Sequence, residues 1–394
     1  MMSAVLSNPS HPKYGVATIP FPIPRDQYAH CMELLAALEI GDALKADCKV
    51  EEIDSFYTIL KRTEMLTVNV EELNYLAKRL DSFDTGEAAQ FQAMAHKLEL
   101  FELKDLINLT FCCQQATVIT DFSDLAAIGR DHYMNLHGGS AKTEELDALD
   151  GKETARQLIE NGGGTITPYG VVYDNGMKLE QIYDGRFFPC YYYEPNAITV
   201  AVTSKAEPED TEHITWLFLP MVQEEIDRAL LRGGITDPSE IRLSLEDSWF
   251  PHEVLDLLDM DHVDISELNA LVQALDEFSD MSIRKYAAAA VMARPHTTEQ
   301  AKHLAENLDL FDFAPSASTP EEYGKYMIQQ SGHFDYDENL DAFYDYEKYG
   351  TERMNEEDGM FTDRGYIAYK GYTSMEEVMN GSQSSHMEMG GLSR

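Results

Sequence analysis

The residues of this sequence that could take part in chemistry are mostly carboxylates, and they are densest between Phe334 and Lys370. Up to Asp363, this acidic–aromatic stretch has only two basic residues, Lys348 and Arg353. Its acids are Asp335, Asp337, Glu338, Asp341, Asp345, Glu347, Glu352, Glu356, Glu357, Asp358 and Asp363. Paired carboxylates can serve as general acids and bases. Acid pairs are so frequent here that none is distinguished as a catalytic centre.

Other catalytic or metal-binding motifs do not accompany these acids. The histidines are scattered, and neither HExxH nor GxSxG occurs. Gly162–Gly164 lacks the Gly-Lys-Ser/Thr ending of a phosphate loop, which predicts a turn before a strand. Asp259, Asp261 and Asp264 resemble the start of an EF-hand loop, but its sixth position is Asp264 instead of Gly and its twelfth is Ala270 instead of Glu. We therefore expect a non-enzymatic protein without catalytic residues, cofactor or specific metal site, and at most weak binding of divalent cations to its acidic surface.

The charge itself is unusual. The 394 residues include 70 acids and 30 lysines and arginines, a net charge of −40. Residues 1–200 contain 30 acids and 16 bases (−14), and residues 201–394 contain 40 and 14 (−26). A field of this sign repels nucleic acids and anionic membranes and attracts basic protein surfaces. Direct binding to nucleic acid or membrane is therefore not expected.

The acidic–aromatic stretch is predicted to fold. Disordered acidic tails are usually poor in aromatic residues, because they bury no apolar surface. Here the aromatic side chains are Phe334, Tyr336, Phe343, Tyr344, Tyr346, Tyr349 and Phe361. They supply apolar surface for a folded segment with a densely negative exterior.

The sequence also indicates a cytoplasmic protein. Its five cysteines are odd in number, lie in the first half and show no CxxC spacing, which favours reduced, mostly buried thiols. The N-terminus shows no basic segment followed by an apolar run. No apolar run approaches the ~20 residues that span a bilayer.

One segment occurs twice, 195 residues apart. Val70–Phe83 (VEELNYLAKRLDSF) and Ile265–Phe278 (ISELNALVQALDEF) are identical at seven of fourteen positions, where ordinary composition predicts about one. Thr165–Val172 and Met360–Ile367 follow the same offset. Weaker matches recur in the same order along the chain. A tandem duplication accounts for this better than a shared amphipathic pattern, which would not preserve one offset.

Each half is predicted to open with an alternating strand and to continue with helices, followed by a hairpin-like segment. The expected strands are Thr18–Pro24, an edge strand because of its prolines, and His213–Leu219. The expected helices are Asp26–Glu39, Val70–Leu80, Glu87–Leu98, Ser123–Met134, Glu224–Arg232, Ile265–Phe278, Ile283–Met292 and Thr319–Gln329. A turn is expected at Asp174-Asn175-Gly176.

The fold class that follows is α+β: an elongated chain of several small subdomains in two tandem-duplicated halves, each with short antiparallel strands and helices. The expected boundaries are a first half at 1–203, a polar linker at 204–212, a second half at 213–381 and a disordered tail at 382–394.

Two interpretations of the charge remain open at this point. An acidic surface often serves only solubility. Alternatively, the carboxylates imitate DNA, which carries one negative charge per ~1.7 Å of axis, so that forty charges correspond to roughly 70 Å or about 20 base pairs. Binding to a basic groove would then be fast, salt-sensitive and competitive with DNA.

The acidic–aromatic stretch resembles the C-terminal motif of ArdA antirestriction proteins. The resemblance rests on FYDYEKYG, Arg353-Met354-Asn355-Glu356, Phe361-Thr362-Asp363 and Gly365-Tyr366 within Asn339–Tyr369, and on the preceding Thr319–Ile328 (TPEEYGKYMI). The wider layout is similar to longer ArdA-type proteins encoded on conjugative elements such as conjugative transposons.

The resemblance implies an acidic, multi-subdomain DNA mimic that occupies the DNA-binding groove of Type I restriction–modification enzymes, chiefly their methyltransferase and specificity core. Such inhibitors protect incoming mobile DNA, and the eleven acids listed above would form the partner-binding surface. Reversal of Asp341, Asp345, Glu347, Glu356 and Glu357 to lysine is then expected to abolish inhibition while leaving the fold intact.

This chain is about twice as long as short ArdA proteins, which act as homodimers, so it is either a homodimer or a single-chain pseudo-dimer. In its first half, Glu145–Ala155 (ELDALDGKETA) stands where FYDYEKYG would be. The alternative function is an acidic adaptor that binds another basic DNA-processing protein of a mobile element. An enzyme of unknown type is the third possibility.

Overall fold

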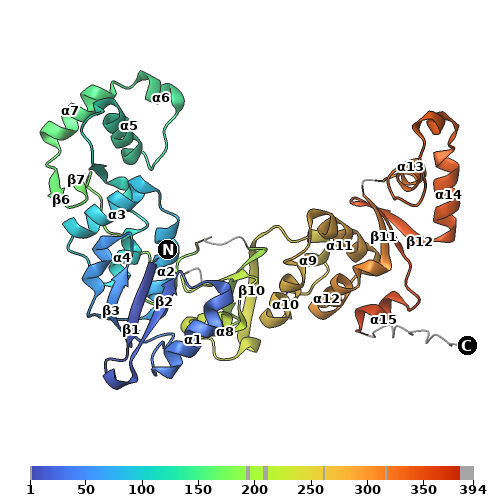
Figure 1. Ribbon diagram of the computed structural model, residues 1–394, viewed down its shortest axis with the longest axis horizontal. Helices are drawn as coiled ribbons and strands as arrows, with labels where there is room; N and C mark the ends of the chain where they lie inside the picture. Colours follow the sequence, from blue (N-terminus) through green and yellow to red (C-terminus); the bar gives the residue numbers. More distant parts are fainter. Residues whose placement is uncertain (1, 192–195, 207–211, 261, 316, 382–394) are drawn as a thin grey trace, which may run out of the picture. The chain divides into compact units, whose positions relative to one another are not determined.

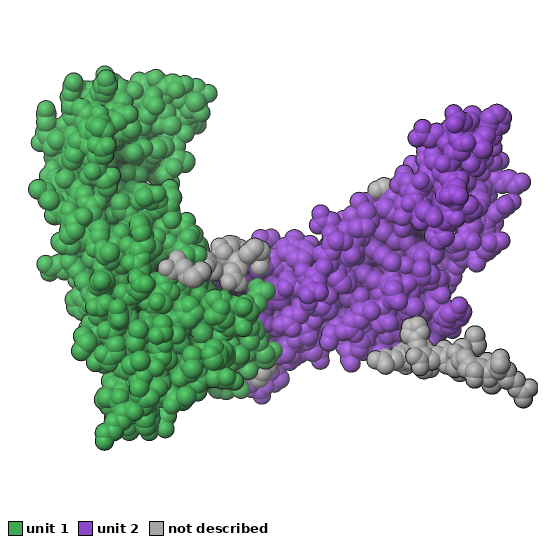
Figure 2. Space-filling model, viewed as in Figure 1, with its two compact units in different colours: residues 1–195, 210–216, 222–236 green, residues 196–209, 217–221, 237–394 purple. Residues whose placement is uncertain are grey.

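The computed structural model describes residues 2–191, 196–206, 212–260, 262–315 and 317–381 (Figure 1). The predicted disordered tail, 382–394, lies outside the described residues, as does most of the predicted linker. Contacts divide the chain into two compact units (Figure 2). Unit 1 contains residues 1–195, 210–216 and 222–236, and unit 2 contains residues 196–209, 217–221 and 237–394.

Unit 1 begins with an antiparallel sheet of order β2-β1-β3-β4. Its strands are β1 (Met2–Ser7), β2 (Val16–Phe21), β3 (Cys48–Asp54) and β4 (Thr67–Val68). The helices of this part are α1 (Tyr28–Ala37), α2 (Val70–Asp81), α3 (Thr85–Lys97) and α4 (Leu103–Leu109). Strand β2 lies at the edge of the sheet, as its prolines predict.

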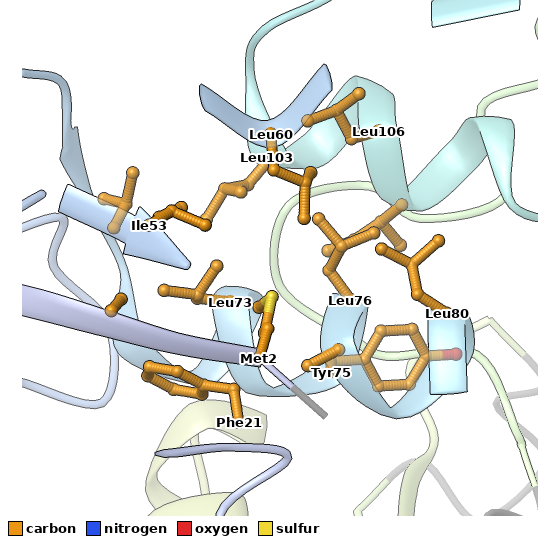
Figure 3. Packing of buried hydrophobic residues seen from close by; sticks show 14 of the residues in the cluster. Met2, Phe21, Ile53, Leu60, Leu73, Tyr75, Leu76, Leu80, Leu103 and Leu106 are labelled. Atoms are coloured by element: carbon orange, nitrogen blue, oxygen red, sulfur yellow. The ribbon is translucent and has the colours of Figure 1, made fainter. Parts of the chain in front are cut away.

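Helix α2 carries much of the core of unit 1 (Figure 3). The Asn69 side chain accepts a hydrogen bond from the Glu72 amide and caps its first turn. Leu73, Leu76 and Leu80 recur at helical spacing and are at most 2% exposed. Burial of each such side chain stabilises the fold by about 1.5–3 kcal/mol.

A smaller subdomain of unit 1 follows, with a sheet of order β5-β7-β6. Its elements are β5 (Thr117–Ile119), α5 (Leu125–Leu136), α6 (Thr143–Ala148), α7 (Gly151–Asn161), β6 (Thr165–Thr167) and β7 (Gly170–Tyr173). Helix α3 packs against this sheet and connects the subdomain to the rest of the unit.

The second part of the chain has the same kinds of elements. A sheet of order β10-β8-β9 comes first, and a sheet of order β11-β13-β12 comes last. The strands are β8 (Ile198–Ser204), β9 (Thr215–Leu219), β10 (Ile241–Ser248), β11 (Phe311–Pro315), β12 (Asp358–Thr362) and β13 (Gly365–Tyr369). The helices are α8 (Gln223–Gly233), α9 (His252–Leu255), α10 (Ile265–Leu275), α11 (Asp280–Ala293), α12 (Thr298–Glu306), α13 (Pro320–Gln329), α14 (Tyr346–Glu356) and α15 (Met375–Met379).

Short 3₁₀ turns join several of these elements: Pro12–Tyr14, Arg25–Gln27, Thr58–Thr63, Cys113–Gln115, Pro238–Glu240, Leu308–Leu310 and Glu338–Phe343. The α+β class, with several small subdomains and antiparallel sheets, is thus confirmed. Each predicted helix is present within a few residues of its expected bounds. The expected turn at Asp174–Gly176 is also present, with Asn175 and Gly176 at φ 53° and 77°.

The expectation that each half opens with the alternating strand is wrong. In both parts a further strand precedes it, β1 in the first and β8 in the second, and this strand lies between its two neighbours in the sheet. The first five residues of β8 are buried, and its Ile198, Val200 and Val202 alternate with smaller residues, a strand signal that the prediction missed. Strand β8 begins before the expected linker and pairs with β10 beyond it.

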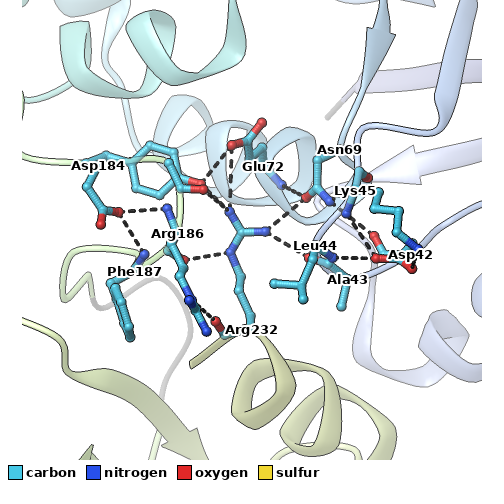
Figure 4. A network of polar contacts seen from close by, with 12 residues as sticks. Asp42, Ala43, Leu44, Lys45, Asn69, Glu72, Asp184, Arg186, Phe187 and Arg232 are labelled. Atoms are coloured by element: carbon cyan, nitrogen blue, oxygen red, sulfur yellow. Dashed lines mark hydrogen bonds and ion pairs between the residues drawn. The ribbon is translucent and has the colours of Figure 1, made fainter. Parts of the chain in front are cut away.

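Helix α8 follows the expected linker in sequence but belongs to unit 1. Its Arg232 is 5% exposed and donates from Nε to the Arg186 carbonyl at 2.8 Å and from Nη1 to the Ala43 carbonyl at 2.9 Å (Figure 4). Its Nη2 donates to the Tyr183 hydroxyl and lies 3.6 Å from Glu72. All three nitrogens of the planar guanidinium thus have partners, so Arg232 holds α8 in a fixed orientation within unit 1.

Two further observations concern the chain as a whole. Cys31, Cys48, Cys112 and Cys113 are buried, as expected. Within the described residues, no helix has the length and apolar character needed to cross a membrane.

Candidate DNA-mimicking acidic surface

The acidic–aromatic stretch, up to Tyr369, lies in one subdomain of unit 2, which we call the acidic subdomain (residues 311–369). It consists of the β11-β13-β12 sheet and the helices α13 and α14 (Figure 1). These 59 residues contain 14 acids and only four lysines and arginines. Some of its aromatic residues form a small core, in which the Tyr323 and Tyr366 rings lie 4.2 Å apart and Phe361 lies 5.2 Å from Tyr366. Phe334 and Phe343, which were expected to supply apolar surface to the fold, are exposed instead.

Helices α13 and α14 meet at two glycines. A Cβ atom on Gly350 would lie 1.8 Å from the Pro320 carbonyl oxygen, and one on Gly324 would lie 2.0 Å from the Tyr346 carbonyl oxygen. Only glycine allows the two backbones to approach this closely. The Tyr-Gly pairs in TPEEYGKYMI and YEKYG therefore have a packing role, holding the acidic helix α14 against α13.

Glu357 is the least exposed of the eleven predicted acids. It accepts a hydrogen bond from the Tyr323 hydroxyl at 2.7 Å and forms an ion pair with Arg353, and its side chain is 16% exposed. Burial, followed by this hydrogen bond to a carboxylate, raises the pKa of Tyr323. Glu357 thus stabilises the inside of the subdomain and contributes little to its surface.

Asp341 orders the loop between α13 and α14. It accepts hydrogen bonds from Tyr336 Oη at 2.7 Å, from Gln329 Nε2 at 2.9 Å and from the Tyr346 hydroxyl. The bonds from Tyr346 and Tyr336 lower the pKa of Asp341. One exposed carboxylate therefore connects the end of α13, the loop and the start of α14.

Two more of the eleven acids act at the ends of helices. Asp345 Oδ1 accepts from the Lys348 amide at 3.0 Å and caps α14, and Asp337 Oδ1 accepts from the Asn339 amide at 2.9 Å and caps the 3₁₀ turn. Both carboxylates are exposed. Negative charge at these positions also interacts favourably with the helix dipole. They combine a local structural role with surface charge.

The other seven acids are exposed and make up what we call the outward acidic set: Asp335, Glu338, Glu347, Glu352, Glu356, Asp358 and Asp363. Glu352 lies 4.0 Å from Lys348 and Glu356 lies 3.8 Å from Arg353. Neither pair is close, and both acids are mostly exposed, so solvent screens these attractions. The outward acidic set is available to a positively charged partner.

Sequence reasoning missed parts of this surface. Asp312, Glu321 and Glu322 are exposed and belong to the same subdomain, but they lie outside the densest stretch. Leu340 (47% exposed) and Phe343 (83% exposed) share one face of the 3₁₀ turn, where positions three apart coincide. The spacing of three residues between Leu340 and Phe343 is visible in the sequence and could have indicated that they share one face.

The corresponding subdomain of unit 1 has the same scaffold with less charge. Residues 117–173 contain nine acids and four lysines and arginines. Helices α5 and α7 again meet at glycines, since a Cβ atom on Gly129 would lie 1.8 Å from the Gly151 carbonyl oxygen. The segment 145–155, which stands where the acidic motif would be, forms the end of α6 and the start of α7.

Among the described residues, no group of three or more His, Cys, Asp or Glu side chains could hold a metal ion. Of the three aspartates that begin the EF-hand-like pattern, Asp261 lies outside the described residues. Asp264 caps α10 instead, accepting from the Ser266 amide at 2.8 Å.

The comparison with known families concerns the second part of the chain, which contains the acidic subdomain. Residues 211–368 match the model of the ArdA family, described as "Antirestriction protein (ArdA)". The resemblance found in the sequence is thus confirmed for this segment, and residues 1–210 lie outside the match. No curated protein and no solved structure matches the chain.

Proposed function

We propose that this protein is a DNA mimic that inhibits Type I restriction–modification enzymes by occupying their DNA-binding groove, chiefly in the methyltransferase and specificity core. It acts by binding, without a catalytic centre. The observation that carries the proposal is the outward acidic set, displayed on an ordered subdomain within the segment that matches an antirestriction family.

Order in this surface supports mimicry over a purely solubilising role. A solubilising surface needs charge but no fixed geometry. Here Asp341 with its three donors, the cap at Asp345 and the glycine contact of α13 with α14 all hold acids in place. Carboxylates at fixed positions accept bidentate arginine bonds much as phosphates do. Preorganisation also reduces the entropy lost on binding.

The test is inhibition of DNA cleavage and methylation by a purified Type I enzyme, with a Type II endonuclease as the control. Inhibition of the Type I enzyme should weaken steeply as salt rises, because the partner's basic groove is screened. The Type II enzyme should be unaffected. Absence of inhibition at low salt, with the protein in molar excess over enzyme, would reject the proposal.

We further propose that the chain arose by tandem duplication and forms a single-chain pseudo-dimer, in which the second half begins with β8 and therefore earlier than the expected residue 213. The support is the shared strand order of β2-β1-β3 with β9-β8-β10 and of β5-β7-β6 with β11-β13-β12. Asn74 and Asn269, 195 residues apart, also accept similar hydrogen bonds, from the Ile23 and Met221 amides. Sedimentation should then give a monomer, and a stable homodimer would argue against the pseudo-dimer.

A further inference from the structure

A two-point ion pair connects the acidic subdomain to the helices that precede it in unit 2. Arg364, in the turn between β12 and β13, donates from Nε to Glu253 Oε1 at 2.6 Å and from Nη2 to Oε2 at 3.3 Å. The Glu253 side chain is 10% exposed and that of Arg364 is 36% exposed. Such a forked pair fixes orientation as well as distance.

The position of this ion pair in the fold allows it to restrict rotation of the acidic subdomain. Glu253 belongs to α9, which packs against α11, and α11 in turn packs against β11, β12 and β13. The acidic subdomain therefore touches the preceding helices through one face of its sheet and, separately, through the turn that carries Arg364. Two separated contacts restrict rotation of a subdomain more than one does.

A contact at the same place occurs in unit 1, 195 residues earlier. Tyr169, in the turn between β6 and β7, forms a hydrogen bond of 3.0 Å between its hydroxyl and Oγ1 of Thr58. Helix α3 packs there against the 3₁₀ turn Thr58–Thr63 and against β7, as α11 does against α9 and β13. The location of the contact is shared, but a single neutral hydrogen bond replaces the forked ion pair.

The electrostatics favour the charged form of the pair. Burial alone would raise the pKa of Glu253, but the hydrogen bond from Arg364 and its charge outweigh this and lower it. The side-chain hydrogen bond with Glu253 likewise raises the pKa of Arg364. Removal of Arg364 would leave a nearly buried carboxylate without its cation, which is strongly unfavourable.

We propose that Glu253 and Arg364 are positioning residues that fix the orientation of the acidic subdomain relative to α9 and α11, so that the outward acidic set meets a basic partner at one spacing. This inference rests on the proposed DNA-mimic function for its consequence in binding. In unit 1, whose corresponding subdomain carries less charge, a neutral hydrogen bond between Tyr169 and Thr58 occupies this place.

The chain itself provides the matched variant, since the double substitution E253T and R364Y installs the neutral contact of unit 1. Spin labels at Glu299 in α12 and Thr351 in α14, both exposed, report the orientation, with Cys190 replaced by serine. We expect the double variant to broaden the distance distribution. Its affinity for a Type I methyltransferase core should fall about tenfold at low salt, while its melting temperature stays close to that of the labelled parent.

The conservative variant R364K should restore part of the orientation and affinity that the double variant loses. It keeps the charge but loses the fork, and should give an intermediate distance distribution and an intermediate affinity. A merely structural role would change melting temperature in proportion to affinity, whereas a positioning role changes affinity and distance distribution together.

The outcomes separate this inference from the function on which it rests. An unchanged distance distribution in the double variant would overturn the positioning role. A broadened distribution with undiminished affinity would overturn its importance for binding and leave the DNA-mimic function intact. If the parent protein itself fails to bind the enzyme, the proposed function fails, while the distance measurement still decides the positioning role.

Discussion

Neutralising three members of the outward acidic set should weaken inhibition without affecting the fold. Asp335, Glu338 and Glu347 are exposed, and within the described residues none of their side chains forms a hydrogen bond or ion pair. The triple variant D335N, E338Q and E347Q therefore removes surface charge without removing a hydrogen bond or an ion pair. Such exposed substitutions usually change the free energy of unfolding by no more than about 0.5 kcal/mol.

The size of the effect follows from Coulomb's law. A carboxylate about 6 Å from a cationic partner group gains about 0.7 kcal/mol at the dielectric constant of water. Three such losses amount to about 2 kcal/mol, or a roughly 30-fold weaker dissociation constant at low salt. The difference between the dissociation constants of the variant and the parent should become smaller as ionic strength rises, because the interactions are screened.

A matched control exists in unit 1. The variant E144Q, E145Q and D147N also removes three exposed acids, from α6 of the corresponding subdomain. Titration of both variants against a Type I methyltransferase core should show the loss only in the first. Equal losses in both would mean that net charge, spread over the chain, governs binding. No loss in either would refute the charge-based reasoning.

The lysine-reversal test suggested by the sequence does not separate an effect on surface charge from an effect on the fold. Of its five positions, Asp341 accepts three hydrogen bonds, Asp345 caps α14 and Glu357 pairs with Arg353 and Tyr323. Reversal at these positions would disturb the local fold, so lost inhibition could not be attributed to lost surface charge.

Three other predictions concern stability. The substitution G350A should lower the free energy of unfolding by about 1–3 kcal/mol, measured by urea denaturation, because its Cβ would overlap the Pro320 carbonyl; an unchanged value would refute the glycine contact. The substitution R232M should lower the stability of unit 1 by about 3–5 kcal/mol, since Glu72 loses its buried partner, and a calorimetric profile without a lower transition would contradict this. Because the pKa of Asp341 is lowered in the folded state, its stabilisation of the loop is present above its ordinary pKa and is lost as pH falls through the lowered value. The protection of the loop amides against exchange, relative to an unfolded chain at the same pH, should therefore fall on acidification in the parent but not in D341N.

The sequence predicted those parts of the fold that have a clear period or a local signal. Helix α2 was evident from its apolar stripe, and the edge position of β2 from its prolines. Strands β1 and β8 were not predicted, although buried positions alternate along most of β1 and the β-branched residues of β8 favour a strand.

For the candidate site, composition predicted the negative charge but not which acids are exposed to a partner and which stabilise the fold. Nothing in the order of letters distinguishes Glu357, which is largely enclosed, from Asp358, which is exposed. That difference depends on Tyr323, more than thirty residues away in sequence. The pairing of Glu253 with Arg364 was inaccessible for the same reason, since it depends on the packing of α9 against α11.

The central claim is that this protein and DNA compete for one basic groove, and a competition titration tests it most directly. A labelled DNA duplex bound to a Type I methyltransferase core is displaced by the protein at several DNA concentrations and two salt concentrations. The account predicts that the apparent dissociation constant of the protein rises in proportion to free DNA, and that binding weakens at the higher salt. A ternary complex of enzyme, DNA and protein, or an apparent dissociation constant independent of DNA, would contradict it.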